Sequence, residues 1–83
     1  MRENILIVDD DPQIISFLSK YLEKQGFNAL CATTGQQMRD FLAKEKVDLC
    51  LLDVGLPDAD GFELTREIRR TSSLPIIVLS VRN

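Results

Sequence analysis

Aspartates directly follow two short apolar runs in the sequence. Asp9 and Asp10 come after residues 5–8, and Asp53 comes after residues 49–52. A carboxylate can act as a nucleophile, and several carboxylates held together repel one another unless a cation lies between them. Hard divalent cations prefer oxygen ligands of this kind. If the two places meet in space, they would form a metal site beside a carboxylate that can accept a transferred group.

Mg²⁺ fits such a site better than Ca²⁺. It takes one or two carboxylates, keeps several waters and leaves a position for a phosphate oxygen, whereas Ca²⁺ would need more protein oxygens than this pattern offers. Phosphoryl transfer depends mainly on positioning and on neutralising charge. Ser80 follows a third apolar run, residues 76–79, so its hydroxyl could hydrogen-bond a phosphoryl group on Asp53. We therefore expect phosphoryl chemistry with Mg²⁺.

The apolar runs predict the elements that would bring these residues together. Each run is continuous rather than alternating, which is typical of strands buried on both faces. Segments with helical spacing lie between the runs. We expect strands at residues 5–8, 27–32, 49–52 and 76–79, and helices from Pro12 to before Gly26, from about Gly35 through Leu42, and from about Phe62 to near Arg70.

This alternation predicts an α/β fold, a parallel sheet with helices on both faces and the order β-α-β-α-β-α-β. In a strand order of 2-1-3-4, the carboxyl ends of the first and third strands lie side by side at the point where the strand order reverses. Ligands bind at that point in open α/β sheets. Asp9, Asp10 and Asp53 would then converge.

Simpler interpretations apply to some of these aspartates. Asp11 precedes a proline and is best explained as a helix cap. Asp9 and Asp10 taken alone are as typical of a cap or turn as of a metal site. Together with Asp53, the metal interpretation is favoured.

Composition limits the remaining possibilities. The 83 residues are 45% apolar and 28% charged, which suits one globular unit. A net charge of −3 argues against binding of nucleic acid or an anionic membrane by this segment, and the start is unlike a signal peptide, so we expect a cytoplasmic chain.

The arginines and cysteines are given ordinary structural roles. We expect a solvated helix face for Arg66, Arg69 and Arg70. Cys31 and Cys50, without any histidine, are expected as small apolar residues in strands rather than as a zinc site or a disulfide.

Three stretches resemble one known family. Residues 5–12 resemble the first strand and acidic pair of bacterial response-regulator receiver domains, which are CheY-like. Residues 51–61 resemble the phosphoacceptor loop of the same family, and residues 75–80 its fourth strand. The resemblance covers residues 1–83.

The resemblance implies a flavodoxin-like fold and a role for each candidate residue. Asp53 would be the phosphoacceptor, and Asp9, Asp10, Asp53 and the backbone carbonyl of Gly55 would hold Mg²⁺. Ser80 would be the switch hydroxyl. The phosphoryl donor would be a sensor histidine kinase, in a two-component phosphorelay.

A narrower resemblance rests on residues 53–58 and 79–83, which are most similar to the Kdp-type regulators of potassium-transport operons. Those regulators carry a C-terminal winged-helix DNA-binding domain of the OmpR class, so DNA contact is expected only through a domain absent from this chain. Family members also continue with a fourth helix, a fifth strand bearing a lysine, and a fifth helix. We therefore expect the N-terminal portion of a receiver domain, with a fourth-strand edge open to self-association.

Two alternatives come from other classes. One is a Mg²⁺-dependent phosphohydrolase with an aspartate nucleophile. Haloacid-dehalogenase-type hydrolases carry a second aspartate two residues after the nucleophile, and here that residue is Gly55. The other is an interaction module that never binds phosphate, which the acidic cluster disfavours. We expect a signalling phosphoacceptor rather than an enzyme.

Overall fold

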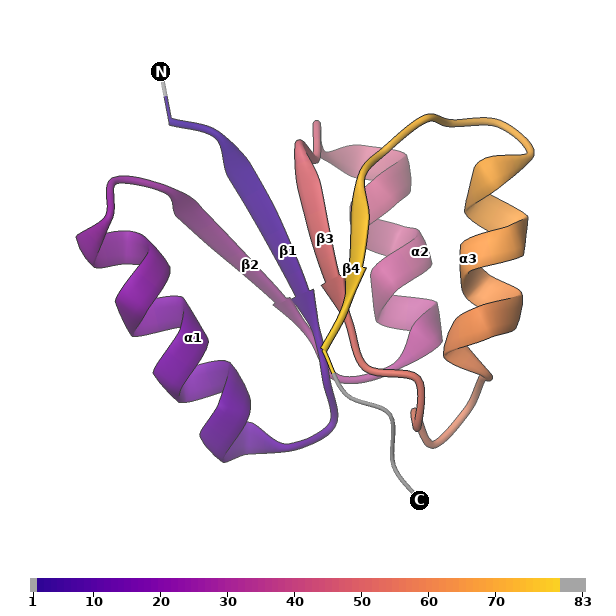
Figure 1. The fold of residues 1–83 in the computed structure, drawn as a ribbon, viewed down its shortest axis with the longest axis horizontal. Helices are drawn as coiled ribbons and strands as arrows, with labels where there is room; N and C mark the ends of the chain where they lie inside the picture. Colours follow the sequence, from indigo (N-terminus) through magenta and orange to yellow (C-terminus); the bar gives the residue numbers. More distant parts are fainter. Residues whose placement is uncertain (1, 80–83) are drawn as a thin grey trace.

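The structure is a computed structural model that describes residues 2–79. Strands and helices alternate along these residues (Figure 1). The elements are β1 (Asn4–Val8), α1 (Pro12–Lys24), β2 (Asn28–Ala32), α2 (Gly35–Lys44), β3 (Leu49–Leu52), α3 (Gly61–Arg69) and β4 (Ile76–Val78). Each element that the apolar runs and the helical spacing predict is present, with ends that differ by a residue or two.

The strands form one parallel sheet in the order β2-β1-β3-β4. In the register between β1 and β3, Val8 lies opposite Leu52, so these two strands end level with each other. The predicted strand order is confirmed. The residues that follow β1 and β3 therefore meet at the point where the strand order reverses.

Both faces of the sheet are covered, which explains why the strands read as continuous apolar runs. In β1, Leu6 and Val8 belong to the apolar cluster beneath α2 and α3, whereas Ile5 and Ile7 pack with Leu22 of α1. Figure 1 shows α1 on one side of the sheet and α2 and α3 together on the other. Successive side chains of a strand point to opposite faces, so both sets are buried.

The ends of α1 match the expected signals. The carboxylate of Asp11 accepts a hydrogen bond from the Gln13 backbone N–H at 2.9 Å, and Pro12 stands at the first helical position. After the helix, Gly26 adopts a φ of 93°, which glycine takes without steric cost. The interpretation of Asp11 as a cap is confirmed.

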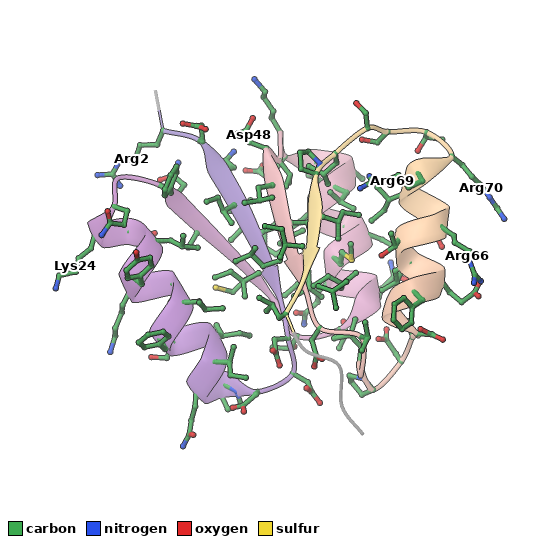
Figure 2. All side chains as sticks on the ribbon, in the orientation of Figure 1. Arg2, Lys24, Asp48, Arg66, Arg69 and Arg70 are labelled. Atoms are coloured by element: carbon green, nitrogen blue, oxygen red, sulfur yellow. The ribbon has the colours of Figure 1, made fainter. Side chains whose placement is uncertain are left out.

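The arginines of α3 and the two cysteines also agree with their expected roles. Arg66, Arg69 and Arg70 are all exposed residues. Figure 2 shows Arg66 and Arg70 pointing away from the fold, whereas Arg69 points back toward β4 and donates a hydrogen bond to the Leu74 carbonyl. Cys50 lies buried in β3, where burial raises the pKa of its thiol to about 12. Cys31 lies half-buried in β2, and its pKa is raised first by burial. Over residues 2–79, no helix has the length and apolar character needed to span a membrane.

Candidate functional site

The site lies at the carboxyl ends of β1 and β3. The backbone N–H of Asp9 donates to the carbonyl of Ala32 at 3.0 Å, and that of Asp53 donates to the carbonyl of Val8 at 2.8 Å. The sheet ladder thus continues one residue past each strand and fixes both aspartate backbones. Their side chains are buried, with exposed fractions of 1% for Asp9 and 0% for Asp53.

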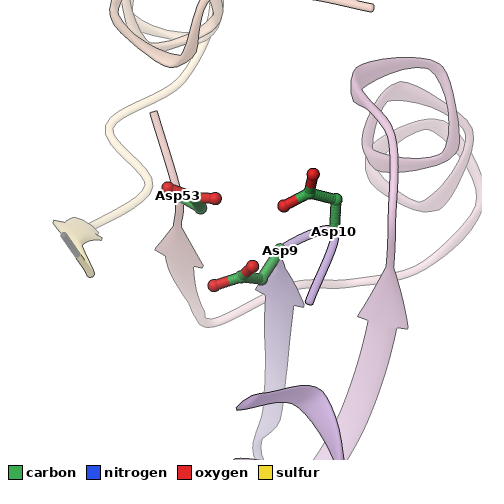
Figure 3. A group of neighbouring side chains, drawn as sticks. All are labelled: Asp9, Asp10 and Asp53. Carbon is green, nitrogen blue, oxygen red and sulfur yellow. The ribbon is translucent and has the colours of Figure 1, made fainter. Parts of the chain in front are cut away.

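Three carboxylates converge there. Each of Asp9, Asp10 and Asp53 offers an oxygen, and these oxygens all lie within 4.8 Å of one another. Figure 3 shows the three side chains around the gap between the ends of β1 and β3. Asp10 is exposed, so the site is open to water on its side. The sequence prediction that these residues meet is confirmed.

The donor set fits Mg²⁺ in chemical type. All three side chains supply hard anionic oxygens, and the solvent-facing position of Asp10 leaves room for the waters that Mg²⁺ retains. Three negative charges this close also favour a divalent cation on electrostatic grounds.

Local backbone groups hold the two buried carboxylates. Asp9 Oδ1 accepts a hydrogen bond from the Asp11 N–H at 2.9 Å. Asp53 Oδ1 accepts one from the Gly55 N–H at 3.2 Å. These bonds orient the carboxylates relative to the loops that follow β1 and β3. The bond to Asp53 also brings the backbone of Gly55, the fourth predicted metal ligand, next to the nucleophile candidate.

The segment 55–60, which we call the β3–α3 loop, is closed at its base. Gly55 and Asp60 form an isolated antiparallel bridge. The Gly61 N–H donates to the Val54 carbonyl at 3.1 Å, and Asp60 caps α3 by accepting from the Phe62 N–H at 2.8 Å. The loop therefore leaves and re-enters the fold at nearly the same place, directly beside the acidic cluster.

Gly61 is required at this junction. A Cβ on Gly61 would lie 2.5 Å from the Cα of Val54 and 3.0 Å from the carbonyl oxygen of Asp53. Both atoms belong to the backbone that carries the nucleophile candidate, so they cannot move aside cheaply. The lack of a side chain at Gly61 lets α3 begin against the end of β3.

Asp58 has a role that the sequence analysis missed. In the sequence it is only one residue of the loop after Asp53, but in the structure its carboxylate accepts hydrogen bonds from two backbone N–H groups at the start of α2. Oδ1 lies 2.7 Å from the Gly35 nitrogen, and Oδ2 lies 3.1 Å from the Gln36 nitrogen. These bonds hold the pKa of Asp58 below its usual value. Because the partners are more than twenty residues away along the chain, no local pattern could have revealed the contact.

Ser80, the predicted switch hydroxyl, lies outside the described residues. The residue before it, Leu79, donates its N–H to the carbonyl of Leu52 at 2.9 Å. The chain thus reaches position 79 alongside the end of β3. The predicted role of Ser80 stays a prediction.

The fold and the site define a class, a CheY-like α/β domain with an acidic cluster at the carboxyl edge of its sheet. Comparison with known families gives a match to the response regulator receiver domain over residues 5–83. The chain belongs to this family, the receiver domains of two-component response regulators.

Curated relatives extend the match. The chain is 36% identical over 83 residues to the response regulator GtcR of Aneurinibacillus migulanus, covering 100% of this chain and 34% of that protein. It is 42% identical over 88 residues to the transcriptional regulatory protein AruR of Pseudomonas aeruginosa, covering 100% of this chain and 36% of that protein. The chain thus spans about a third of the length of these relatives.

Solved structures agree in fold. The receiver domain of Klebsiella pneumoniae RstA, activated with beryllium trifluoride, is similar with a TM-score of 0.91 and 33% identity, over 98% of this chain and 69% of that chain. The MaeR response regulator bound to beryllium trifluoride is similar with a TM-score of 0.90 and 34% identity, over the same shares of the two chains.

Proposed function

We propose that this chain is the phosphoryl-accepting switch of a two-component phosphorelay, with Asp53 as the residue that is phosphorylated. Receiver domains of response regulators usually act with sensor kinases, and a sensor histidine kinase is the proposed donor here. The observation that carries the proposal is the meeting of Asp9, Asp10 and Asp53 oxygens within 4.8 Å at the ends of β1 and β3.

The position of Asp53 supports its role as the nucleophile. It follows β3, one of the two inner strands, and its backbone is fixed by the ladder to β1. Asp9 is held in a similar way after β1, so Asp53 is chosen because residues 51–61 resemble the phosphoacceptor loop of the family. A carboxylate oxygen would attack the phosphorus of a phosphohistidine on the kinase. The P–N bond breaks, its electron pair stays on the imidazole, which takes a proton, and an acyl phosphate forms on Asp53.

The groups that would hold Mg²⁺ are the carboxylates of Asp9, Asp10 and Asp53 and the backbone carbonyl of Gly55. When bound, the ion would neutralise charge on the carboxylates and on the transferred group, which is the main requirement of phosphoryl transfer. Ser80 is proposed to hydrogen-bond the phosphoryl group. The similar structures of MaeR and RstA are described with beryllium trifluoride. When its beryllium bonds to an oxygen, this compound becomes a tetrahedral mimic of a phosphoryl group. The similarity therefore supports a phosphoryl site in this chain.

The first prediction tests the phosphoacceptor. Incubation with acetyl phosphate and Mg²⁺ should add one phosphoryl group to the protein, detected by intact-mass analysis, and Asp53→Asn should abolish the addition because an amide is not a nucleophile for phosphorus. Asp40→Asn is the matched control, since it removes the same charge from an exposed position on α2. Equal labelling of the Asp53→Asn protein would show that the acceptor lies elsewhere.

The same measurement separates the switch from the hydrolase alternative. A switch should accumulate one stable acyl phosphate per chain and then stop. A phosphohydrolase should convert the whole pool of acetyl phosphate with turnover. We propose the switch because Gly55 stands where the hydrolases carry their second aspartate. An interaction module that never binds phosphate should show neither result.

We further propose that the phosphorylated chain controls a C-terminal DNA-binding domain outside these 83 residues, of the OmpR class and the Kdp type. AruR, described as a transcriptional regulatory protein, is nearly three times as long as the matched region. The narrower resemblance rests on residues 53–58 and 79–83. The reading frame beyond Asn83 tests the proposal, because it should encode a winged-helix domain.

A further inference from the structure

Asp58 joins the β3–α3 loop to α2, two parts of the chain that the sheet alone does not connect. Its two carboxylate oxygens each take one backbone N–H, from Gly35 at 2.7 Å and from Gln36 at 3.1 Å. We call this pair of contacts the Asp58 latch. Thr34 caps the same helix from within its own turn by accepting from the Gln37 N–H, so the latch is an addition to an already capped helix.

The latch is electrostatically favourable. An ionised carboxylate accepts charge-assisted hydrogen bonds, and the amino end of a helix carries partial positive charge. The depressed pKa of Asp58, caused first by the bond from the Gly35 N–H, agrees with this. Because Asp58 is exposed, the latch contributes little to the stability of the fold. Its importance is that it fixes the position of the β3–α3 loop.

The close fit around Gly35 is a second, independent observation. A Cβ on Gly35 would lie 2.9 Å from the Cβ of Ala59, 3.2 Å from Leu64 Cδ1 and 3.3 Å from Asp58 Oδ1. The tip of the β3–α3 loop is therefore seated directly on the first residue of α2, and only a residue without a side chain permits that approach.

The loop has few ways to move once both its base and its tip are held. The bridge between Gly55 and Asp60 closes the base, and the Asp58 latch holds the tip. Only residues 56 and 57 lie between Gly55 and Asp58. Because this connection is so short, a shift of the tip would be passed on toward Gly55, whose N–H contacts the Asp53 carboxylate at 3.2 Å.

We propose that Asp58 is a positioning residue for the metal and phosphoacceptor site, which acts by holding the Gly55 backbone in place through the loop. This inference rests on the proposed function, since it assigns Asp58 to the support of that same site. By linkage, the coupling runs both ways: Mg²⁺ bound at the acidic cluster should tighten the contact of Asp58 with α2.

The experiment is a Mg²⁺ titration of the 83-residue chain followed by the backbone amide NMR signals. We compare the wild type with Asp58→Asn, Asp58→Ala and the control Asp40→Asn. Urea melts identify a temperature at which all four proteins are folded, so that partial unfolding does not change the measured Mg²⁺ affinity. We expect about tenfold weaker Mg²⁺ binding for Asp58→Ala, the lower end of the effects of groups that support metal ligands. Asp58→Asn keeps one oxygen acceptor and should lie in between.

The outcomes separate this inference from the proposed function. Equal Mg²⁺ affinity in Asp58→Ala and Asp40→Asn would overturn the positioning role while leaving the metal site intact. Absence of any Mg²⁺ response at Asp9, Asp10 and Asp53 in the wild type would overturn the metal site itself. In that case the Gly55 amide signal in the metal-free proteins still decides the inference. A shift in Asp58→Ala but not in Asp40→Asn supports the latch, and an unchanged signal overturns it.

Discussion

Asp10 differs from the other two members of the acidic cluster because it faces solvent while Asp9 and Asp53 are buried. A substitution at Asp10 therefore changes the charge of the cluster without disturbing the core. This makes Asp10 the residue at which metal binding can be separated from folding.

We predict that Mg²⁺ raises the melting temperature of the protein and that Asp10→Ala greatly reduces this rise. A ligand that binds only the folded state stabilises it by mass action, by about 2.7 kcal/mol at a concentration 100 times its dissociation constant. Thermal melts with increasing Mg²⁺ measure the effect, and Asp40→Asn should respond like the wild type. An undiminished response in Asp10→Ala would remove Asp10 from the metal site.

At the scale of the elements, the junction of β3 and α3 is closely packed. Here the first residue of a helix packs against the backbone that carries the phosphoacceptor candidate. The Val54 backbone would lie only 2.5 Å from a Cβ on Gly61. The helix can begin at this place only if residue 61 has no side chain.

We predict that Gly61→Ala destabilises the protein by about 1–3 kcal/mol, the usual cost of overpacking. The gain in helix propensity from glycine to alanine is at most about 1 kcal/mol, so the steric cost should dominate. The midpoint of a urea melt measures the change. Ser16→Ala on the exposed side of α1 is the control and should change stability by no more than about 0.5 kcal/mol. An unaltered midpoint for Gly61→Ala would mean that the junction can widen freely.

At the scale of the whole fold, the described part of the chain leaves one edge of the sheet unpaired at β4. Within residues 2–79, β4 pairs only with β3, and its residues Ile77 and Val78 are 53% and 38% exposed. Ile77 lies opposite Leu51, on the sheet face of α1, and Leu51 is itself only partly buried. An apolar strand with an unpaired edge is a template for pairing with another chain.

We predict that the 83-residue chain associates with itself in a concentration-dependent manner through the edge of β4. Sedimentation over a range of protein concentrations measures the association. Ile77→Lys should weaken it, because a charged residue on an edge strand opposes pairing. The corresponding control is Phe17→Lys, which places the same charge at an exposed apolar residue of α1. A chain that stays monomeric at all concentrations and unfolds cooperatively would contradict the prediction.

Much of the fold and the core of the site could be predicted from the sequence, because both depend on local order along the chain. Continuous apolar runs mark strands covered on both faces, and helical spacing between them requires parallel strands with right-handed crossovers. Once the order 2-1-3-4 is expected, any polar residue that directly follows β1 or β3 must lie at the reversal point. Asp9, Asp10 and Asp53 could therefore be assigned to one site before their distances were known.

Only the tertiary structure decided how the loop beside that site is held. The Asp58 contacts join residues 22 and 23 positions apart, and the spaces filled by Gly35 and Gly61 depend on neighbours from other segments. Such contacts leave no spacing pattern, because a loop aspartate or a glycine at a helix start looks the same in the sequence whether or not another segment packs against it. Their roles follow from the packing of whole elements, which periodicity and composition do not encode.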